Sequence, residues 1–396
     1  MFTYTPKSEI DPRIRNFQAQ MKAAGTDGAL ILQNTDLFYF AGTIQQSQLY
    51  VPADGLPILM VKKNFERACQ ESRLDRIVPI VSPRQIPEIL SHHGYAMPKI
   101  LGMELDVLPA ALYLNFCKIF ESSKITDISH PIRMVRSIKS EHEIALIREA
   151  CRLSDAMFAC IGSLIREGVS EVALSGEIEA IARKSGSQGI VRMRLWGSEL
   201  FYGHFMSGAA AAMPSYLSSP TGGMGTSPAT AQGASLKKIS KHEPILADYT
   251  FAYQGYISDQ TRIFSLGSLS DDLLRAHDAM LSVQETVKTH AKPGADVGEL
   301  YEIAVAHVKK SGYDDNFMGV GDDRIRFIGH GVGLELDEYP FLAKGQTMRL
   351  EKNMTIAIEP KLIFPGRGVV GIENTYLVND DGLEQLTRFE ENVIAV

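Results

Sequence analysis

The stretch Ile245–Gly267, ILADYTFAYQGYISDQTRIFSLG, decides the fold because it can place two carboxylates side by side. It is rich in aromatic and β-branched residues and is interrupted by Gln-Gly at positions 254–255. This pattern predicts two antiparallel strands joined by a two-residue turn. In that register Asp248 faces Thr261, and side-chain alternation puts Asp259 on the same face as Asp248. Two such close negative charges call for a proton or a cation between them, and carboxylate oxygens suit divalent metals.

The composition indicates a globular protein of two or three domains. The chain has 396 residues, of which 45% are hydrophobic, and its net charge is −7. This acidic balance argues against nucleic acid or an anionic membrane as the main partner. The sequence shows no apolar stretch of signal-peptide length near its start and no window close to the ~20 apolar residues of a membrane helix. We therefore expect a cytoplasmic protein.

The sequence pattern predicts two domains, over residues 1–132 and 133–396. Helical and extended segments alternate in the first, which indicates an α/β domain. The second opens with a long helix, because Ser140 and Glu143 form a capping box before an apolar stripe. With the strands around the carboxylates, the second domain is predicted to be α+β, with helices packed on a curved antiparallel sheet. Further helices are expected to begin at Ser170, Ser270 and Asp296.

One low-complexity segment, Ser218–Ser235, interrupts this second domain. Its Gly, Ser, Pro and Thr residues cannot fill a core, so we expect a mobile surface loop. Its glycines do not indicate a phosphate-binding loop, because no strand-to-helix frame or P-loop lysine accompanies them.

Three further metal-competent residues follow in the last third of the chain. His330 lies in FIGHGVGLELDEYP, Glu359 in TIAIEPKLIF and Glu373 in VVGIENTYLV. The glycines beside His330 allow close approach of the backbone, and both glutamates lie near the ends of β-rich runs. A single such residue is more often structural. Taken together with the two aspartates, however, they form a plausible ligand set for two divalent cations.

The order Asp, Asp, His, Glu, Glu within SDQTR, GHGVGL, IEP and GIENT resembles the pita-bread-fold metallopeptidases. These include methionine aminopeptidase, aminopeptidase P and prolidase, with creatinase as a relative. An N-terminal α/β domain that leads through IRMVRSIKSEHEIALIREA into the second domain is similar to the aminopeptidase P, prolidase and creatinase branch. The resemblance implies a creatinase-like α/β domain over residues 1–132, followed by a pita-bread catalytic domain over residues 133–396.

The resemblance also implies a ligand set. Asp248 would bind one metal, His330 and Glu359 would bind the other, and Asp259 and Glu373 would bridge both. Manganese is our first choice for the two divalent ions, because the donors are mostly hard oxygens and the family favours it; cobalt, zinc and iron are alternatives.

The activity implied is hydrolysis of Xaa-Pro bonds in short, proline-containing peptides by a metal-bridging hydroxide. Glu359 is the candidate to carry a proton to the leaving nitrogen, beside the ligand His330. Thr261 and Thr375 are candidate donors that orient the carboxylates. An ordinary strand threonine is an equal alternative for Thr375 and a weaker one for Thr261, which the hairpin register places opposite Asp248. The resemblance further implies a homodimer.

The sequence departs from the usual family pattern at three positions. Ser215 and Asp337 stand where peptidase members usually have histidines, and Gly371 stands where an arginine is frequent. These changes spare the metal ligands but alter the groups expected to bind the substrate carbonyl. His204, in ELFYGHFMSG, is a candidate catalytic residue because it can replace one lost imidazole; a structural role is the alternative.

Two other functions stay open. A relative with altered substrate contacts could keep the activated water and hydrolyse a non-peptide C–N bond in a small amide. A non-catalytic peptide-binding or protein-binding module is a further alternative, but it predicts eroded ligands, whereas all five are present.

Overall fold

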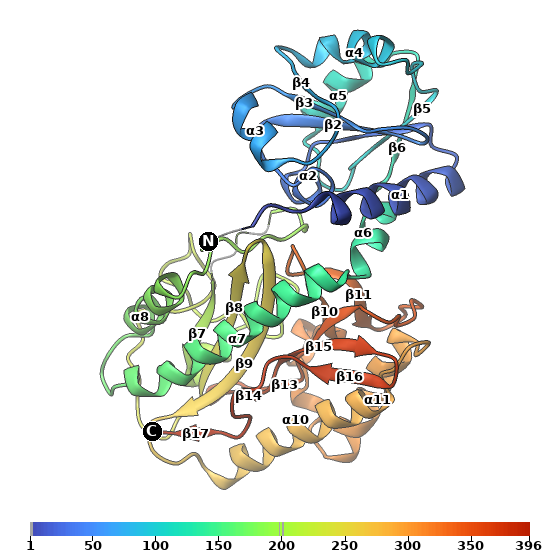
Figure 1. The fold of residues 1–396 in the computed structure, drawn as a ribbon. Helices are drawn as coiled ribbons and strands as arrows, with labels where there is room; N and C mark the ends of the chain where they lie inside the picture. Colours follow the sequence, from blue (N-terminus) through green and yellow to red (C-terminus); the bar gives the residue numbers. More distant parts are fainter. Residues whose placement is uncertain (1–2, 198, 200–201) are drawn as a thin grey trace. The chain divides into compact units, whose positions relative to one another are not determined.

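The structure is a computed structural model that describes residues 3–197, 199 and 202–396 (Figure 1). The chain forms two compact units. The first contains the described residues up to Arg136 together with Arg194–Gly197, and the second contains the other described residues. The predicted domain boundary between residues 132 and 133 lies within helix α6 (Ser129–Ser137).

The first unit is an α/β domain built on one six-stranded sheet in the order β4-β3-β2-β1-β5-β6. The pairs β1–β2 and β2–β3 are antiparallel, and the remaining neighbours are parallel. Its core consists mainly of apolar residues from these strands and from α4 and α5. The elements are α1 (Lys7–Ala23), β1 (Gly28–Ile31), α2 (Asn34–Ala41), β2 (Ser47–Pro52), β3 (Ile58–Val61), α3 (Phe65–Glu71), β4 (Ile77–Pro79), α4 (Ile86–His92), β5 (Ile100–Met103), α5 (Ala110–Ile119), β6 (Lys124–Asp127) and α6.

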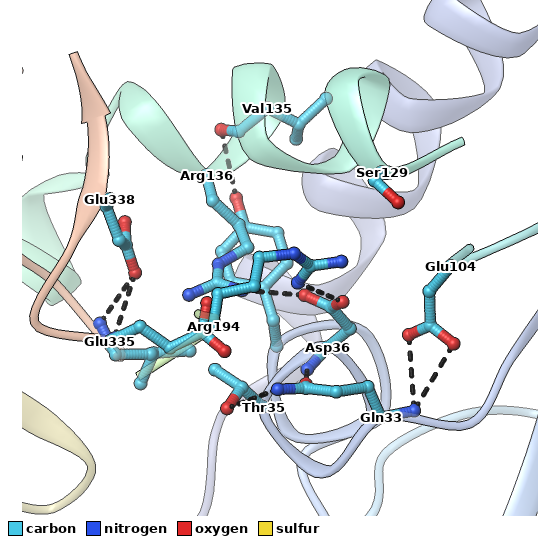
Figure 2. A network of polar contacts seen from close by, with 12 residues as sticks. Gln33, Thr35, Asp36, Glu104, Ser129, Val135, Arg136, Arg194, Glu335 and Glu338 are labelled. Carbon is cyan, nitrogen blue, oxygen red and sulfur yellow. Dashed lines mark hydrogen bonds and ion pairs between the residues drawn. The ribbon is translucent and has the colours of Figure 1, made fainter. Parts of the chain in front are cut away.

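A buried ionic network lies within this first unit. Asp36 accepts hydrogen bonds from Arg136 at 2.7 Å and from Arg194 at 2.8 Å (Figure 2). Arg194 also contacts Asp106 at 2.6 Å. Burial raises the pKa of Asp36, but the two guanidinium groups outweigh it and lower the pKa overall. These contacts explain why residues 194–197 belong to the first unit although they lie far along the sequence.

The four predicted helices of the second unit begin where the sequence predicts, and the short helix α9 is an addition. Ser140 Oγ accepts from the Glu143 amide at 3.2 Å, and the Ser140 amide donates to Glu143 Oε2 at 3.0 Å, which confirms the capping box. Within the described residues, no helix has the length and apolarity needed to cross a membrane. The helices are α7 (Glu141–Leu164), α8 (Glu171–Lys184), α9 (Gly208–Ala211), α10 (Asp271–His290) and α11 (Val297–Lys310).

Three sheets make up the rest of the second unit. They are ordered β17-β9-β8-β7, β11-β10-β12-β15-β16 and β13-β14, and they are mostly antiparallel. Helix α7 packs on β8 and β9, and α10 packs on α11 and against β13, β14 and β16 (Figure 1). The strands are β7 (Gly203–Ser207), β8 (Ile245–Tyr253), β9 (Tyr256–Ser265), β10 (Phe327–Gly331), β11 (Glu338–Ala343), β12 (Thr355–Ile358), β13 (Lys361–Phe364), β14 (Gly368–Gly371), β15 (Asn374–Asn379), β16 (Gly382–Gln385) and β17 (Ile394–Ala395).

The predicted hairpin register is confirmed. Asp248 in β8 pairs with Thr261 in β9, and Asp259 in β9 pairs with Thr250 in β8. Gln254 and Gly255 form the turn with φ values of 47° and 97°. Positive φ at both central residues is the geometry that matches the twist of a two-residue hairpin.

The segment 218–235 differs in part from its prediction. An exposed run covers residues 226–231, as expected of a surface loop. The prediction is wrong for Thr221, Gln232 and Ser235, which are buried. Buried Glu171 holds this end of the segment, because it accepts bonds from the Ser235 amide at 2.9 Å and hydroxyl at 2.6 Å. Polar contacts to a buried carboxylate thus supply the packing that side-chain apolarity does not.

Candidate metal centre

The structure brings all five predicted ligands into one cluster in the second unit. Asp248 lies on β8, Asp259 on β9 and His330 on β10, while Glu359 follows β12 and Glu373 lies between β14 and β15. His330 Nε2 is 3.6 Å from both Asp259 Oδ2 and Glu359 Oε1. One ligand atom from each of Asp259, His330 and Glu373 lies within 4.8 Å of the other two.

Main-chain pairing between the sheets brings these residues together. An isolated bridge pairs Thr261 on the hairpin with Glu373, with reciprocal amide-to-carbonyl distances of 3.3 Å. Strand β12, which leads to Glu359, pairs with β10 on one side and with β15 on the other. The carboxylates therefore project from hydrogen-bonded strands, which hold them in fixed positions.

The glycines beside His330 allow these strands to approach closely. A Cβ atom at Gly329 would lie 2.2 Å from the carbonyl oxygen of Ala357, and one at Gly331 would lie 2.2 Å from that of Tyr339. The predicted close backbone approach is thus confirmed. His330 Nδ1 lies 3.1 Å from the Gly331 carbonyl oxygen, to which it donates, so Nε2 is the ring nitrogen that faces the carboxylates.

The two predicted supporting threonines act differently. Thr261 Oγ1 donates to Glu373 Oε2 at 2.8 Å and so orients a predicted ligand. Thr375 Oγ1 instead contacts the Asp259 main chain, where it accepts from the amide at 2.9 Å and donates to the carbonyl at 2.8 Å. The prediction that Thr375 orients a carboxylate directly is wrong, because its hydroxyl fixes the backbone.

Arg262 is a further supporting residue that the sequence reasoning missed. Its buried guanidinium donates at 2.8 Å to the carbonyl oxygens of Thr261 and Glu373 and to Asn374 Oδ1. Burial lowers the pKa of Arg262 to about 10, although nearby acidic groups oppose the shift. The signal in the sequence was an arginine inside the predicted strand segment DQTRIF, where a buried charged side chain requires partners.

Lys361 is the second missed residue, and it lies inside the cluster. Its Nζ is 2.7 Å from Glu359 Oε2, 3.1 Å from Glu373 Oε2 and 3.2 Å from Asp248 Oδ2, and its side chain is only 1% exposed. Burial disfavours the ammonium, but the three carboxylates outweigh this and hold the pKa of Lys361 well above its usual value. The signal was a lysine at the start of the apolar run KLIF.

Crowding of the carboxylates shifts their protonation. Burial, followed by the charges of Glu373, Asp248 and Glu359, raises the pKa of Asp259 well above its usual value. Burial also raises the pKa of Glu373 to about 7, although the Lys361 ammonium opposes the shift. The cluster therefore binds positive charge, whether protons, the ammonium or a metal ion.

The donor set fits one divalent cation. Asp259, His330 and Glu373 converge within metal-binding range, and Glu359 adds a fourth donor beside His330. Three carboxylates and one imidazole are suitable ligands for a borderline-hard divalent ion. The donor set does not offer an equal place for a second ion next to Asp248, because the Lys361 ammonium already contacts Asp248 and Glu373.

His204 lies next to the cluster, directly across from Asp248 in the β7–β8 pair. It is buried, which lowers its pKa, and its Nε2 is 3.1 Å from the Gln232 amide nitrogen. Ser215, at the first departure from the family pattern, accepts a bond from the Leu217 amide at 3.0 Å. His204 is thus the imidazole that the strand pairing places beside a predicted ligand.

Asp337, at the second departure, precedes Glu338, a buried residue that holds the loop after His330 in place. The Glu338 carboxylate accepts from the amides of Leu334 at 2.8 Å and Glu335 at 3.2 Å (Figure 2). It also pairs with Lys139 at 2.8 Å. Glu338 thus fixes the backbone of the loop that contains Asp337.

Comparison with known proteins identifies the family. Residues 145–380 match metallopeptidase family M24, and residues 13–138 match the creatinase/prolidase N-terminal domain. Because the first match covers more than half of the chain, the chain belongs to metallopeptidase family M24. It is a metallopeptidase with the pita-bread fold, as the sequence motifs predicted.

Individual relatives agree with this assignment. The Xaa-Pro dipeptidase of Pyrococcus furiosus is 27% identical over 387 residues, which cover 96% of this chain and 99% of the relative. The solved structure of the Xaa-Pro dipeptidase from Bacillus anthracis has a TM-score of 0.83 at 26% identity, covering 98% of this chain and 100% of that one. The X-Pro aminopeptidase from Thermotoga maritima has a TM-score of 0.80 at 22% identity, covering 97% and 99%, and supports the fold alone.

Replacing Thr261 with valine tests the support of Glu373. The substitution keeps the side-chain shape but removes the 2.8 Å hydrogen bond, so we expect manganese affinity to fall about 10- to 100-fold. Calorimetric titration of chelator-stripped protein with Mn²⁺ measures this. Thr289→Val, at an exposed position on α10, is the matched control and should leave the affinity unchanged. Equal affinities in all three proteins would contradict the role of Thr261.

Proposed function

We propose that this metallopeptidase hydrolyses Xaa-Pro bonds in short peptides, as an aminopeptidase P or a prolidase. The single observation that carries the proposal is the convergence of Asp259, His330 and Glu373 within 4.8 Å. These residues occur in the motif order of this family, and relatives named as Xaa-Pro dipeptidases cover nearly the whole chain. The proposed substrate class follows from these relatives.

The proposed metal ligands are Asp259, His330, Glu359 and Glu373, with Asp248 as the fifth predicted member. Two ions that share Asp259 and Glu373, as the resemblance implies, would require Lys361 to withdraw from Asp248 and Glu373. Manganese remains the first choice, because carboxylate oxygens predominate among the donors, with cobalt, zinc and iron as alternatives.

A bound divalent ion would lower the pKa of the water molecule that it binds and would polarise the carbonyl group of the scissile bond. The residues of the chain supply the rest of the chemistry. We assign Glu359 to carry a proton from the attacking water to the leaving nitrogen, since its Oε1 faces the ligand group. His330 and the surrounding strands keep these groups at fixed separations, so little reorganisation is needed during the reaction.

A peptide panel tests the proposed function. Chelator-stripped protein should not cleave Xaa-Pro dipeptides or Xaa-Pro-Yaa tripeptides, and added Mn²⁺, Co²⁺ or Zn²⁺ should restore cleavage, while matched Xaa-Ala peptides stay intact. A preference for dipeptides would indicate prolidase-like action, and a preference for longer peptides would indicate aminopeptidase-P-like action.

Two variants accompany this panel. Asp259→Asn should lose at least about 100-fold in activity together with its tightly bound metal, because a buried ligand is removed. Asp322→Asn, at an exposed position, is the matched control and should behave as wild type. Undiminished activity and metal content in Asp259→Asn would contradict the ligand assignment.

A second function is favoured by the three departures from the family pattern. Ser215, Asp337 and Gly371 replace groups expected to contact the substrate, so the site could act on a non-peptide C–N bond in a small amide. Metal uptake without cleavage of any peptide in the panel, but with hydrolysis of a small amide, would favour this alternative. Metal uptake without any hydrolysis would favour a binding module.

We further propose that His204 supports the substrate carbonyl in place of a lost imidazole. His204→Ala should reduce kcat about 100-fold while metal content stays the same, because a donor to developing negative charge is lost. Steady-state kinetics with parallel metal analysis measures both quantities. His290→Ala, on the exposed end of α10, is the control. A kcat within twofold of wild type in His204→Ala would make His204 a structural histidine.

The homodimer implied by the resemblance is also part of the proposal. Light scattering at micromolar concentration should give about twice the 43.6 kDa mass of the chain. A mass equal to that of one chain would contradict it.

A further inference from the structure

The Lys361 ammonium occupies part of the space in which the family ligand set would hold metal. Its three carboxylate partners are a predicted ligand of one ion (Asp248), a predicted ligand of the other ion (Glu359) and a predicted bridging ligand of both (Glu373). The contacts with Glu359 at 2.7 Å and Glu373 at 3.1 Å are hydrogen bonds, and the contact with Asp248 at 3.2 Å is an ion pair. Lys361 is therefore a buried cation within the cluster and not a surface lysine.

The contacts of Lys361 fall unequally on the two expected ion positions. The ion next to Asp248 would need Asp248 together with the bridging Asp259 and Glu373, and Lys361 contacts two of these three. At the other position Lys361 contacts Glu373 and the Oε2 atom of Glu359, while Asp259, His330 Nε2 and Glu359 Oε1, 3.6 Å from the imidazole, remain as donors. The ammonium thus competes mainly with the ion next to Asp248.

Gly371, the third departure from the family pattern, makes room for this lysine. Gly371 pairs directly with Lys361 across the β13–β14 ladder. A Cβ atom at Gly371 would lie 2.7 Å from Lys361 Cα, 2.9 Å from Lys361 Cγ and 2.5 Å from the Pro360 carbonyl oxygen. A side chain at position 371, where the family frequently has arginine, would displace Lys361. The glycine and the lysine therefore belong to one structural change.

The placement of the charges, and not their sum, disfavours a second ion, because one ion leaves a net charge of −4 + 3 = −1 and two leave −4 + 5 = +1. The four carboxylates carry a formal charge of −4, and Lys361 with one divalent ion supplies +1 + 2 = +3. A second divalent ion would raise the positive charge to +5 and would share Asp248 and Glu373 with the ammonium. Like charges at such short separation in a buried site repel strongly.

We propose that the Lys361 ammonium takes the place of one of the two family metal ions, so that this enzyme works with a single divalent ion. The ion is bound by Asp259, His330, Glu359 and Glu373, and Asp248 serves as the partner of Lys361. This inference rests on the proposed metal-dependent function and specifies its metal content.

Metal stoichiometry tests the inference independently of activity. Wild-type protein equilibrated with Mn²⁺ and separated from unbound ions should retain one ion per chain by elemental analysis. Its electron paramagnetic resonance spectrum should show an isolated manganese ion. Lys361→Met, which has similar length but no charge, should retain two ions per chain and give the signal of a coupled pair. Lys344→Met, at an exposed position, is the matched control and should retain one.

Asp248→Asn provides a second variant in case Lys361→Met does not fold. Because Asp248 pairs with the lysine in this account, the variant should still retain one ion per chain. Loss of that ion would contradict the ligand assignment on which the inference rests.

The outcomes for wild type separate this inference from the proposed function. Two ions per chain would overturn the inference and leave the metallopeptidase function intact, with Lys361 as a neighbouring cation only. No ion at saturating Mn²⁺ would overturn both. One ion in wild type and also one in folded Lys361→Met would show that the lysine is not what excludes the second.

Discussion

The architecture of the second unit depends on the placing of four carboxylates in one largely buried cluster. Burial and mutual repulsion disfavour their ionised forms, as the raised pKa values of Asp259 and Glu373 show. Such a cluster is stable only if positive charge is bound within it. The chain itself supplies part of that charge through Lys361, and the proposed divalent ion would supply the rest. Metal binding would then contribute to the stability of this fold as well as to its chemistry.

The surrounding structure serves to keep these charges in place. The bridge between Thr261 and Glu373 joins the hairpin to the neighbouring β-structure, and Arg262 ties both carbonyl oxygens to one buried guanidinium. The Thr261 hydroxyl holds Glu373, while the Thr375 hydroxyl holds the main chain of Asp259. Charged groups that would otherwise repel one another are therefore carried on backbone with satisfied hydrogen bonds, which is the preorganisation that a hydrolytic site needs.

The sequence predicted local features well, because they follow from local patterns. The register of the hairpin follows from its turn, and the start of α7 follows from the capping box at Ser140. The contacts of the Arg262 and Lys361 side chains could not be predicted in the same way, since their partners are brought close only by tertiary pairing of distant segments. The prediction for the segment 218–235 was a fully exposed loop, but Thr221, Gln232 and Ser235 are buried through polar contacts that composition does not reveal, such as the bonds of Ser235 to Glu171.

Anomalous X-ray diffraction from crystals soaked in Mn²⁺ tests the central claim most directly, because it locates each ion among the carboxylates. The account predicts one anomalous peak per chain, bounded by Asp259, His330, Glu359 and Glu373, with Lys361 Nζ still in contact with Asp248. A second peak between Asp248 and Glu373, with the lysine displaced, would contradict the single-ion centre. The absence of any peak in the cluster at saturating Mn²⁺ would contradict the assignment of this cluster as a metal site.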